Sequence, residues 1–127
     1  MKRWRGRWLL FVCAVHTAFA LVVFRAPLGE IARDGMFDAI KTDPMRGAVA
    51  WFVLFGGAFA IAALAVDQLE REGRSLRRLG AATIALVALG VLWMPASGFW
   101  LALPAALSML ATGDAPATNA APKQATT

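Results

Sequence analysis

The sequence predicts an all-α integral membrane protein: a four-helix bundle with an amphipathic interfacial helix between spans 1 and 2. Hydrophobic residues make up 59% of the 127 residues and charged residues only 17%, whereas soluble domains average about 25% charged residues. Long apolar runs alternate with short clusters of charge. A soluble domain this small has too little interior to bury so much apolar surface, so lipid is the expected solvent.

Four apolar runs are the predicted spans, at about 8–24, 48–66, 79–94 and 98–111. At about 1.5 Å per residue, the first three approach the roughly 30 Å thickness of the hydrocarbon core. Pro95 and Gly98 separate the third run from the fourth, because neither suits a helix interior, and Ser97 is placed to cap the fourth helix. The fourth run is short and contains Pro104, so it either spans with a tilt, thins the bilayer or re-enters.

The first span follows a basic N-terminal arm, a pattern that also fits a signal peptide. Ala18-Phe19-Ala20 resembles a cleavage site, but the apolar run continues from Leu21 to Phe24. A mature chain seldom starts with so apolar a segment, so we expect this segment to stay as the first span. At the other end, residues 112–127 have the composition of a disordered tail, which leaves one domain over 1–111.

The connection between the first two spans carries an apolar stripe at helical spacing. Its members are Leu28, Ile31, Ala32, Gly35, Met36, Ala39 and Ile40, with charged residues between them. The pattern predicts a helix over about 28–41 that lies along the membrane surface or over the mouth of the bundle. We favour an anchoring cover, and a lid over a ligand site is the alternative.

Basic residues predict the orientation. They cluster in the N-terminal arm and in the connection over 67–78, whereas the first connection balances its basic residues with acidic ones. The positive-inside rule then puts both chain ends and the 67–78 connection in the cytoplasm. The tryptophans fall at the two interfaces of the same arrangement: Trp4 and Trp8 inside, Trp51, Trp93 and Trp100 outside. A nucleic-acid partner is not expected, since it needs a continuous basic face.

His16 stands out because an ionisable group inside a predicted span is costly and suggests a functional site. His16 and Cys13, three residues apart on one face, are the candidate cofactor-binding residues. A neutral imidazole can ligate haem or relay a proton, but the spans offer no further His or Cys to complete a metal site. We favour a neutral imidazole hydrogen-bonded to a neighbouring helix, through Thr83, Ser97 or Ser108.

Three other segments allow two interpretations each. Gly56 and Ala60 form a small-xxx-small pair, which favours close packing within the chain and alternatively self-association. The stretch over 94–101 predicts a tight outer turn, and alternatively the rim of an outer pocket formed by Ser97, Trp100 and Trp51. The charged connection over 67–78 predicts a solvated helical extension with local ion pairs, and alternatively a docking site for anionic lipid or a cytoplasmic partner.

Several segments together resemble a family of small four-pass bacterial membrane proteins that carries a domain of unknown function. They are Gly6-Arg7-Trp8-Leu9, His16, Pro27-Leu28 with Gly35, Trp51-Phe52 with Gly56, Glu70, and above all the stretch from Met94 to Leu101 with Pro104. The resemblance covers about residues 6–110. It implies the four-pass fold and the bacterial cytoplasmic membrane, and it implies no catalytic residue.

The function predicted from these patterns is structural. No Asp, Glu, Lys or Arg lies inside an apolar run, so no carboxylate, lysine or second histidine accompanies His16 for acid–base catalysis. We expect an accessory membrane protein, not an enzyme, that binds another membrane protein or lipid. The alternatives are a binder of a small molecule or cofactor, such as haem or quinone, at His16, and an oligomeric transporter of a small solute.

Overall fold

The computed structural model describes residues 3–112, and this part of the chain belongs to the all-α class, as predicted. The elements, in order, are α1 (Arg5–Val23), α2 (Arg25–Arg33), α3 (Pro44–Arg71), α4 (Arg77–Trp93), the 3₁₀ helix η1 (Gly98–Ala102) and α5 (Leu103–Leu110). The helices α1, α3 and α4 and the η1–α5 segment overlap the four predicted apolar runs. Of these, α1 and α3 are long and apolar enough to cross a membrane.

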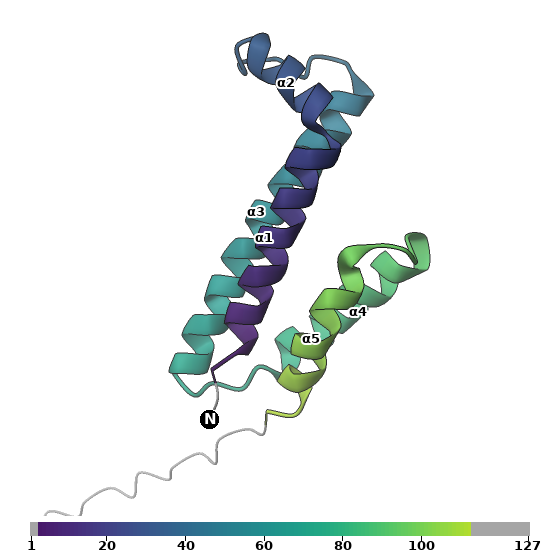
Figure 1. Ribbon diagram of the computed structural model, residues 1–127. Coiled ribbons are helices and arrows are strands. Elements are labelled where there is room, and N and C mark those ends of the chain that lie inside the picture. Colours follow the sequence, from purple (N-terminus) through teal and green to yellow (C-terminus); the bar gives the residue numbers. More distant parts are fainter. Residues whose placement is uncertain (1–2, 113–127) are drawn as a thin grey trace, which may run out of the picture.

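The helices pair into two hairpins (Figure 1). In the first hairpin α1 packs along α3, and in the second α5 and η1 pack along α4. The hairpins meet where α1 begins and α3 and α5 end, which we call the basal end, and they diverge from there toward the opposite end, which carries α2. The second hairpin contacts α1, whereas among the described residues no Cα of α4 lies within 8 Å of α3.

The core lies between the two hairpins and is built largely from small or branched apolar side chains. It contains Leu9, Cys13, Ala63, Val66, Leu76, Val87, Ala102, Ala105 and Met109. Glycines let the backbones approach closely: a Cβ on Gly6 would lie 2.6 Å from the Cα of Asp67, and one on Gly80 would lie 2.9 Å from the Cβ of Met109. These contacts fix α1 on α3 and α5 on α4, because a methyl group at either position would separate the helices.

The helix in the first connection differs from the prediction of 28–41. It spans Arg25–Arg33, so it starts earlier, with Pro27 in its first turn where a missing N–H is tolerated. It ends in a Schellman motif, in which Met36 N donates to Ile31 O (3.2 Å) and Gly35 N to Ala32 O (3.3 Å). Gly35 has φ 88° and Met36 φ 64°, so the helix cannot continue and Phe37 is 94% exposed.

Both ends of α3 extend beyond the predicted apolar run. Asp43 caps its start by accepting from Met45 N (2.9 Å) and Arg46 N (3.3 Å), and Pro44 occupies the first helical position. At its other end the charged residues continue the helix to Arg71. Arg71 and Asp67 form an ion pair at 2.7 Å, of the local kind predicted for this connection. The 67–78 connection is therefore largely helix on its α3 side.

Thr112 belongs to the folded domain and not to the predicted tail. Its side chain is buried, its Oγ1 donates to Met109 O (2.6 Å), and the same oxygen accepts from Leu76 N (3.1 Å). A hydroxyl can make both bonds at once, so Thr112 joins the end of α5 to the start of α4. The rest of the predicted tail, residues 113–127, lies outside the described residues.

Candidate functional site

His16 faces α3 and is hydrogen-bonded to it. The Nε2 atom lies 3.0 Å from the carbonyl oxygen of Phe52. A carbonyl oxygen only accepts, so Nε2 carries the proton and donates it. The ring also stacks on Phe52, with centroids 4.1 Å apart and planes 14° apart, and meets the Phe55 ring at 6.0 Å. The predicted hydrogen bond to a neighbouring helix is present, but its acceptor is a backbone carbonyl instead of Thr83, Ser97 or Ser108.

Gly56 makes the space for this imidazole. A Cβ on Gly56 would lie 2.8 Å from the Cδ2 of His16, closer than carbon atoms approach without a shift. The Gly56 side of α3 is thus covered by α1 of the same chain, and Ala60 packs against the core between the hairpins. Packing within the chain, the interpretation we favour, therefore accounts for the Gly56 and Ala60 pair, while self-association stays a prediction.

Cys13 points to the core and is a free, buried thiol. His16 is instead held against Phe52 and Gly56, so the two candidate cofactor residues are each engaged in different packing contacts. Within residues 3–112, no three His, Cys, Asp or Glu side chains are grouped closely enough to hold a metal ion. His16 makes one hydrogen bond, to the carbonyl of Phe52, and two aromatic contacts, with Phe52 and Phe55.

The turn between α4 and η1 closes on itself. Trp100 Nε1 donates to Pro95 O (2.9 Å), and Ser97 N donates to Met94 O (3.1 Å). The ring of Phe99 covers Gly90, where a Cβ would lie 2.5 Å from its Cδ2. Ser97 does stand at the cap position of η1, but its hydroxyl is buried and makes no hydrogen bond to another described residue.

The residues of the predicted outer rim stand on different hairpins. Trp51 lies on α3 and is 74% exposed, while Ser97 and Trp100 belong to the second hairpin. Among the described residues no Cα of η1 lies within 8 Å of α3. Two grooves lined in part by charged side chains lie at the basal end, away from these three residues. An outer pocket at Ser97, Trp100 and Trp51 stays a prediction.

A polar cluster at the basal end was not predicted as a unit. Arg5 Nη1 donates to Glu70 Oε1 (3.2 Å) and Arg5 Nε to Ser108 Oγ (2.9 Å), while Gly6 N donates to Glu70 Oε2 (3.1 Å). The side chains of Arg5 and Glu70 are 15% and 4% exposed. One carboxylate thus joins α1 to α3, and one guanidinium joins both to α5. The only signal in the sequence is that Arg5 and Glu70 fall at the same predicted side of the membrane.

A second polar cluster surrounds Arg46 near the start of α3. Its Nη1 donates to Asp34 Oδ2 (2.6 Å) and to Ala39 O (2.8 Å), and its Nη2 donates to Glu30 Oε2 (3.2 Å). Arg46 lowers the pKa of the Asp34 carboxyl, first by its hydrogen bond and then by its charge. These contacts tie α2 and the following turns to α3, and the balanced charges of this connection were the signal for them.

Comparison with known proteins identifies a family. The model of a family described as a family of unknown function (DUF6463) matches residues 1–116. No curated protein and no solved structure matches the chain. The matched range includes His16, the Arg5 and Glu70 pair, and the turn after α4, so it covers every contact described above. It also confirms the expected resemblance to a family that carries a domain of unknown function. The chain belongs to this family of unknown function, DUF6463.

Proposed function

We propose that this chain is a four-span protein of the bacterial cytoplasmic membrane with an accessory, non-catalytic role, and that it acts by binding another membrane protein. The observation that carries the membrane location is the exposure of its apolar residues. Of the residues in the most apolar part of each helix, only 28% in α1 and 22% in α3 are buried. The core helix of a soluble protein passes the same length test but is mostly buried, so this exposure favours lipid as the solvent.

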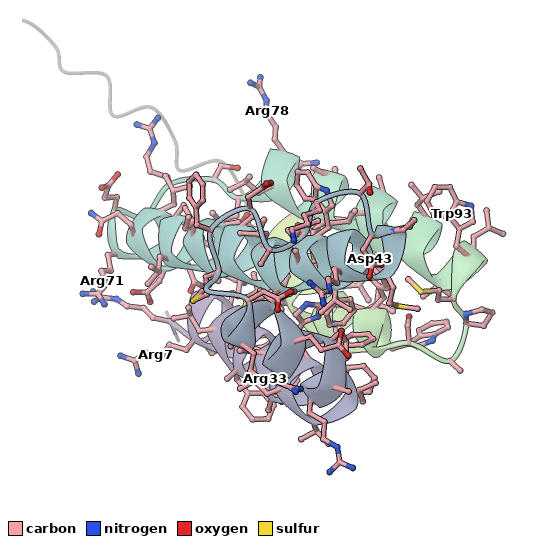
Figure 2. All side chains as sticks on the ribbon, turned by 90° about the horizontal axis from the view of Figure 1, so that it is seen from above. Arg7, Arg33, Asp43, Arg71, Arg78 and Trp93 are labelled. Atoms are coloured by element: carbon pink, nitrogen blue, oxygen red, sulfur yellow. The ribbon has the colours of Figure 1, made fainter. Side chains whose placement is uncertain are left out.

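The distribution of charge supports an inward-facing basal end. Both hairpins carry basic residues there, and Figure 2 shows Arg7, Arg71 and Arg78 projecting outward from the helices. Near the start of α3, in contrast, Arg46 is neutralised by Glu30 and Asp34. The positive-inside rule favours a cytoplasmic basal end for such an arrangement. The antiparallel course of α1 and α3, and of α4 and α5, supports four passes.

The accessory role rests on what the side chains inside the apolar segments do. His16 is engaged with Phe52 and Gly56, and Thr83 donates to Leu79 O (2.8 Å) within its own helix. These contacts fit a role in packing. Among the described residues, no contact favours a cofactor site or a transport pathway over such a role. Large apolar side chains on the outer face of α3, such as Leu54 and Ile61, are available to a helix of another protein.

The orientation is tested by cysteine labelling in a Cys13→Ala background, which removes the native thiol. We expect Asp38→Cys and Ala96→Cys to react with an impermeant maleimide in intact cells, and Arg71→Cys to react only after lysis. All three variants should stay in the membrane pellet after a carbonate wash. Recovery in the soluble fraction would overturn the membrane location. Labelling of Ala96→Cys only after lysis would show that α4 and the η1–α5 segment do not cross the membrane, and would overturn the four-span arrangement.

The accessory role is tested by photocrosslinking in cells. A benzophenone amino acid at Ile61, which is 71% exposed on α3, should give a discrete adduct with a second protein. The matched control is Met109, which is buried between the helices and should give none. A membrane-located protein that forms no adduct from Ile61, Leu54 or Leu64 would contradict a protein partner on this face.

A further inference from the structure

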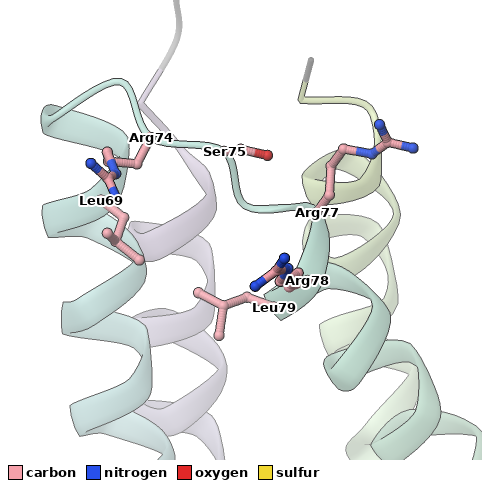
Figure 3. A pocket seen from close by; sticks show the side chains of 6 residues that line it. All are labelled: Leu69, Arg74, Ser75, Arg77, Arg78 and Leu79. Carbon is pink, nitrogen blue, oxygen red and sulfur yellow. The ribbon is translucent and has the colours of Figure 1, made fainter. Parts of the chain in front are cut away.

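A groove opens at the basal end between the end of α3 and the start of α4 (Figure 3). Its volume is about 590 Å³, and its walls are formed by Leu69, Arg74, Ser75, Arg77, Arg78 and Leu79. Figure 3 shows Arg74 on the α3 side and Arg78 on the α4 side, with Ser75 on the connection between them. Leu69 and Leu79 lie farther along the two helices. The groove is therefore cationic at the connection and apolar toward the helices.

The three arginines of this groove have no counter-ion among residues 3–112. Each carboxylate of the neighbouring helix end already has a partner: Asp67 accepts from Arg71 (2.7 Å), Glu70 from Arg5 (3.2 Å) and Glu72 from the Gln68 amide (2.8 Å). The ion pairs of the described residues include none from Arg74, Arg77 or Arg78. The groove thus concentrates positive charge that the described residues leave uncompensated.

The start of α4 adds to this field. Leu76 occupies its cap position without a capping side chain, and its first turn contains no acidic residue. The amide groups of a helix N-terminus carry a partial positive charge, here close to Arg77 and Arg78. An anion in the groove would meet guanidinium groups from both sides and the positive end of α4, which is the environment that phosphate oxygens prefer.

We propose that Arg74 and Arg78 bind the phosphate headgroup of an anionic phospholipid in this groove, with Leu69 and Leu79 against its acyl chains. Arg77, whose side chain points away from α3 in Figure 3, adds positive charge at the edge of the groove. The proposal rests on the membrane location proposed above, which puts the basal end at a lipid interface. The two leucines distinguish a lipid from a free phosphate, because they give the ligand an apolar part to contact. Arg78 also points away from the helices (Figure 2), toward the headgroup layer that surrounds a membrane protein.

Such a lipid would connect two helices whose described backbones do not approach each other closely. The hairpins touch through α1, whereas α3 and α4 have no Cα within 8 Å of each other in the described part of the chain. A headgroup held by Arg74 on one wall and Arg78 on the other bridges these two helices. The lipid then sets the angle between the hairpins, and the bound state is more rigid than the lipid-free state.

The test uses the full chain purified in mild detergent, with native mass spectrometry of bound phosphatidylglycerol and phosphatidylcholine. Each arginine near an anionic lipid contributes about fivefold in affinity, so we expect phosphatidylglycerol to bind on the order of 100-fold more tightly. The triple change Arg74→Gln, Arg77→Gln, Arg78→Gln should abolish that preference. The matched triple change Arg25→Gln, Arg33→Gln, Lys41→Gln removes the same charge near α2 and should leave it intact.

Single changes keep the test decisive if the triple variant unfolds. Arg74→Gln should weaken phosphatidylglycerol binding about fivefold, whereas Arg71→Gln, at the exposed end of α3, should not. Circular dichroism of each variant verifies the fold. Equal binding of the two lipids by the wild type, or equal effects of Arg74→Gln and Arg71→Gln, would overturn the site.

Two further arms separate the lipid from other anions and from the membrane location itself. Inorganic phosphate in large excess should not displace phosphatidylglycerol, and complete displacement would overturn the assignment to a lipid. A benzophenone amino acid at Ser75 should crosslink to lipid in cells, and an adduct with a soluble protein would overturn the proposal in favour of a protein partner. If the carbonate wash releases the protein into the soluble fraction, the membrane location is rejected. If the protein stays in the membrane pellet but shows no preference for phosphatidylglycerol, the lipid site alone is rejected.

Discussion

Arg5 and Glu70 lie 3.2 Å apart at the basal end, although 65 positions separate them in the sequence. Glu70 also accepts from the amide of Gly6, and Arg5 donates to Ser108. One nearly buried ion pair therefore connects α1, α3 and α5. It lies at the basal end, where the two hairpins meet, so it helps to decide how the second hairpin sits on the first.

Removing either partner of this pair should destabilise the protein. Glu70→Gln or Arg5→Gln should each lower the free energy of unfolding by about 3 kcal/mol, because the remaining charge stays buried without its partner. The double variant should lose much less than the sum, as measured by denaturant unfolding in detergent. The control pair Arg71 and Asp67 has an exposed arginine and should show a coupling of about 0.5 kcal/mol. Strict additivity for Arg5 and Glu70 would contradict the pairing.

Gly6 should not tolerate a methyl group. Its Cβ would lie 2.6 Å from the backbone of Asp67, whereas a Cβ on Gly57 would meet nothing within 4 Å. Gly6→Ala must push α1 from α3 and should cost about 1–3 kcal/mol. Gly57→Ala should be neutral or stabilise by up to about 1 kcal/mol, since alanine favours the helix. Thermal unfolding followed by circular dichroism compares the two variants, and equal stability of both would refute this contact.

His16→Ala should lower the stability modestly and leave the ultraviolet–visible absorbance spectrum unchanged. The variant loses one interhelical hydrogen bond, about 0.6 kcal/mol on average in membrane proteins, and an aromatic stack of about 1 kcal/mol. The ultraviolet–visible spectra of the purified wild type and variant, oxidised and reduced, should be the same. An absorbance band that disappears in His16→Ala would instead make this residue a cofactor ligand.

The contact between Asp34 and Arg46 should depend on pH with a defined sign. Because Arg46 lowers the pKa of Asp34 in the folded protein, the contact stabilises the turns after α2 above the ordinary pKa of aspartate, about 3.9. This contribution is lost as the pH falls through the lowered pKa of the folded state. Carbon-13 titration of the Asp34 carboxyl should show the pKa rise in Arg46→Gln. An unchanged pKa in that variant would rule out the contact in solution.

The sequence predicted the helical class and the approximate extent of most helices. The lengths of the apolar runs and the position of Pro95 and Gly98 are local features, and they mark α1, α3, α4 and the η1–α5 segment. The helix after α1 was predicted less well. Its apolar stripe continues to Ile40, but Gly35 and Met36 adopt positive φ and end the helix at Arg33. A stripe at helical spacing shows which face a helix would bury, not whether the helix continues.

The candidate site shows the same division. His16 was predicted from its place in an apolar run, and so was its bond to a neighbouring helix. Its acceptor, the carbonyl of Phe52, could not be predicted, because every residue has such a carbonyl and side-chain chemistry does not mark one. Glu70 was placed among solvated charges, since nothing near it in the sequence shows that Arg5 and Gly6 approach it.

The sequence by itself thus determined which segments are helical, which are apolar and where the charges fall, because these properties depend on a few neighbouring residues. The tertiary structure decided which residues meet: His16 with Phe52, Arg5 with Glu70 and Ser108, Arg46 with Asp34. It also decided that the arginines of the groove meet no carboxylate among the described residues. Such pairings depend on the relative position of segments far apart in the chain, which is set by close packing at glycines such as Gly6, Gly56 and Gly80 and not by any local pattern.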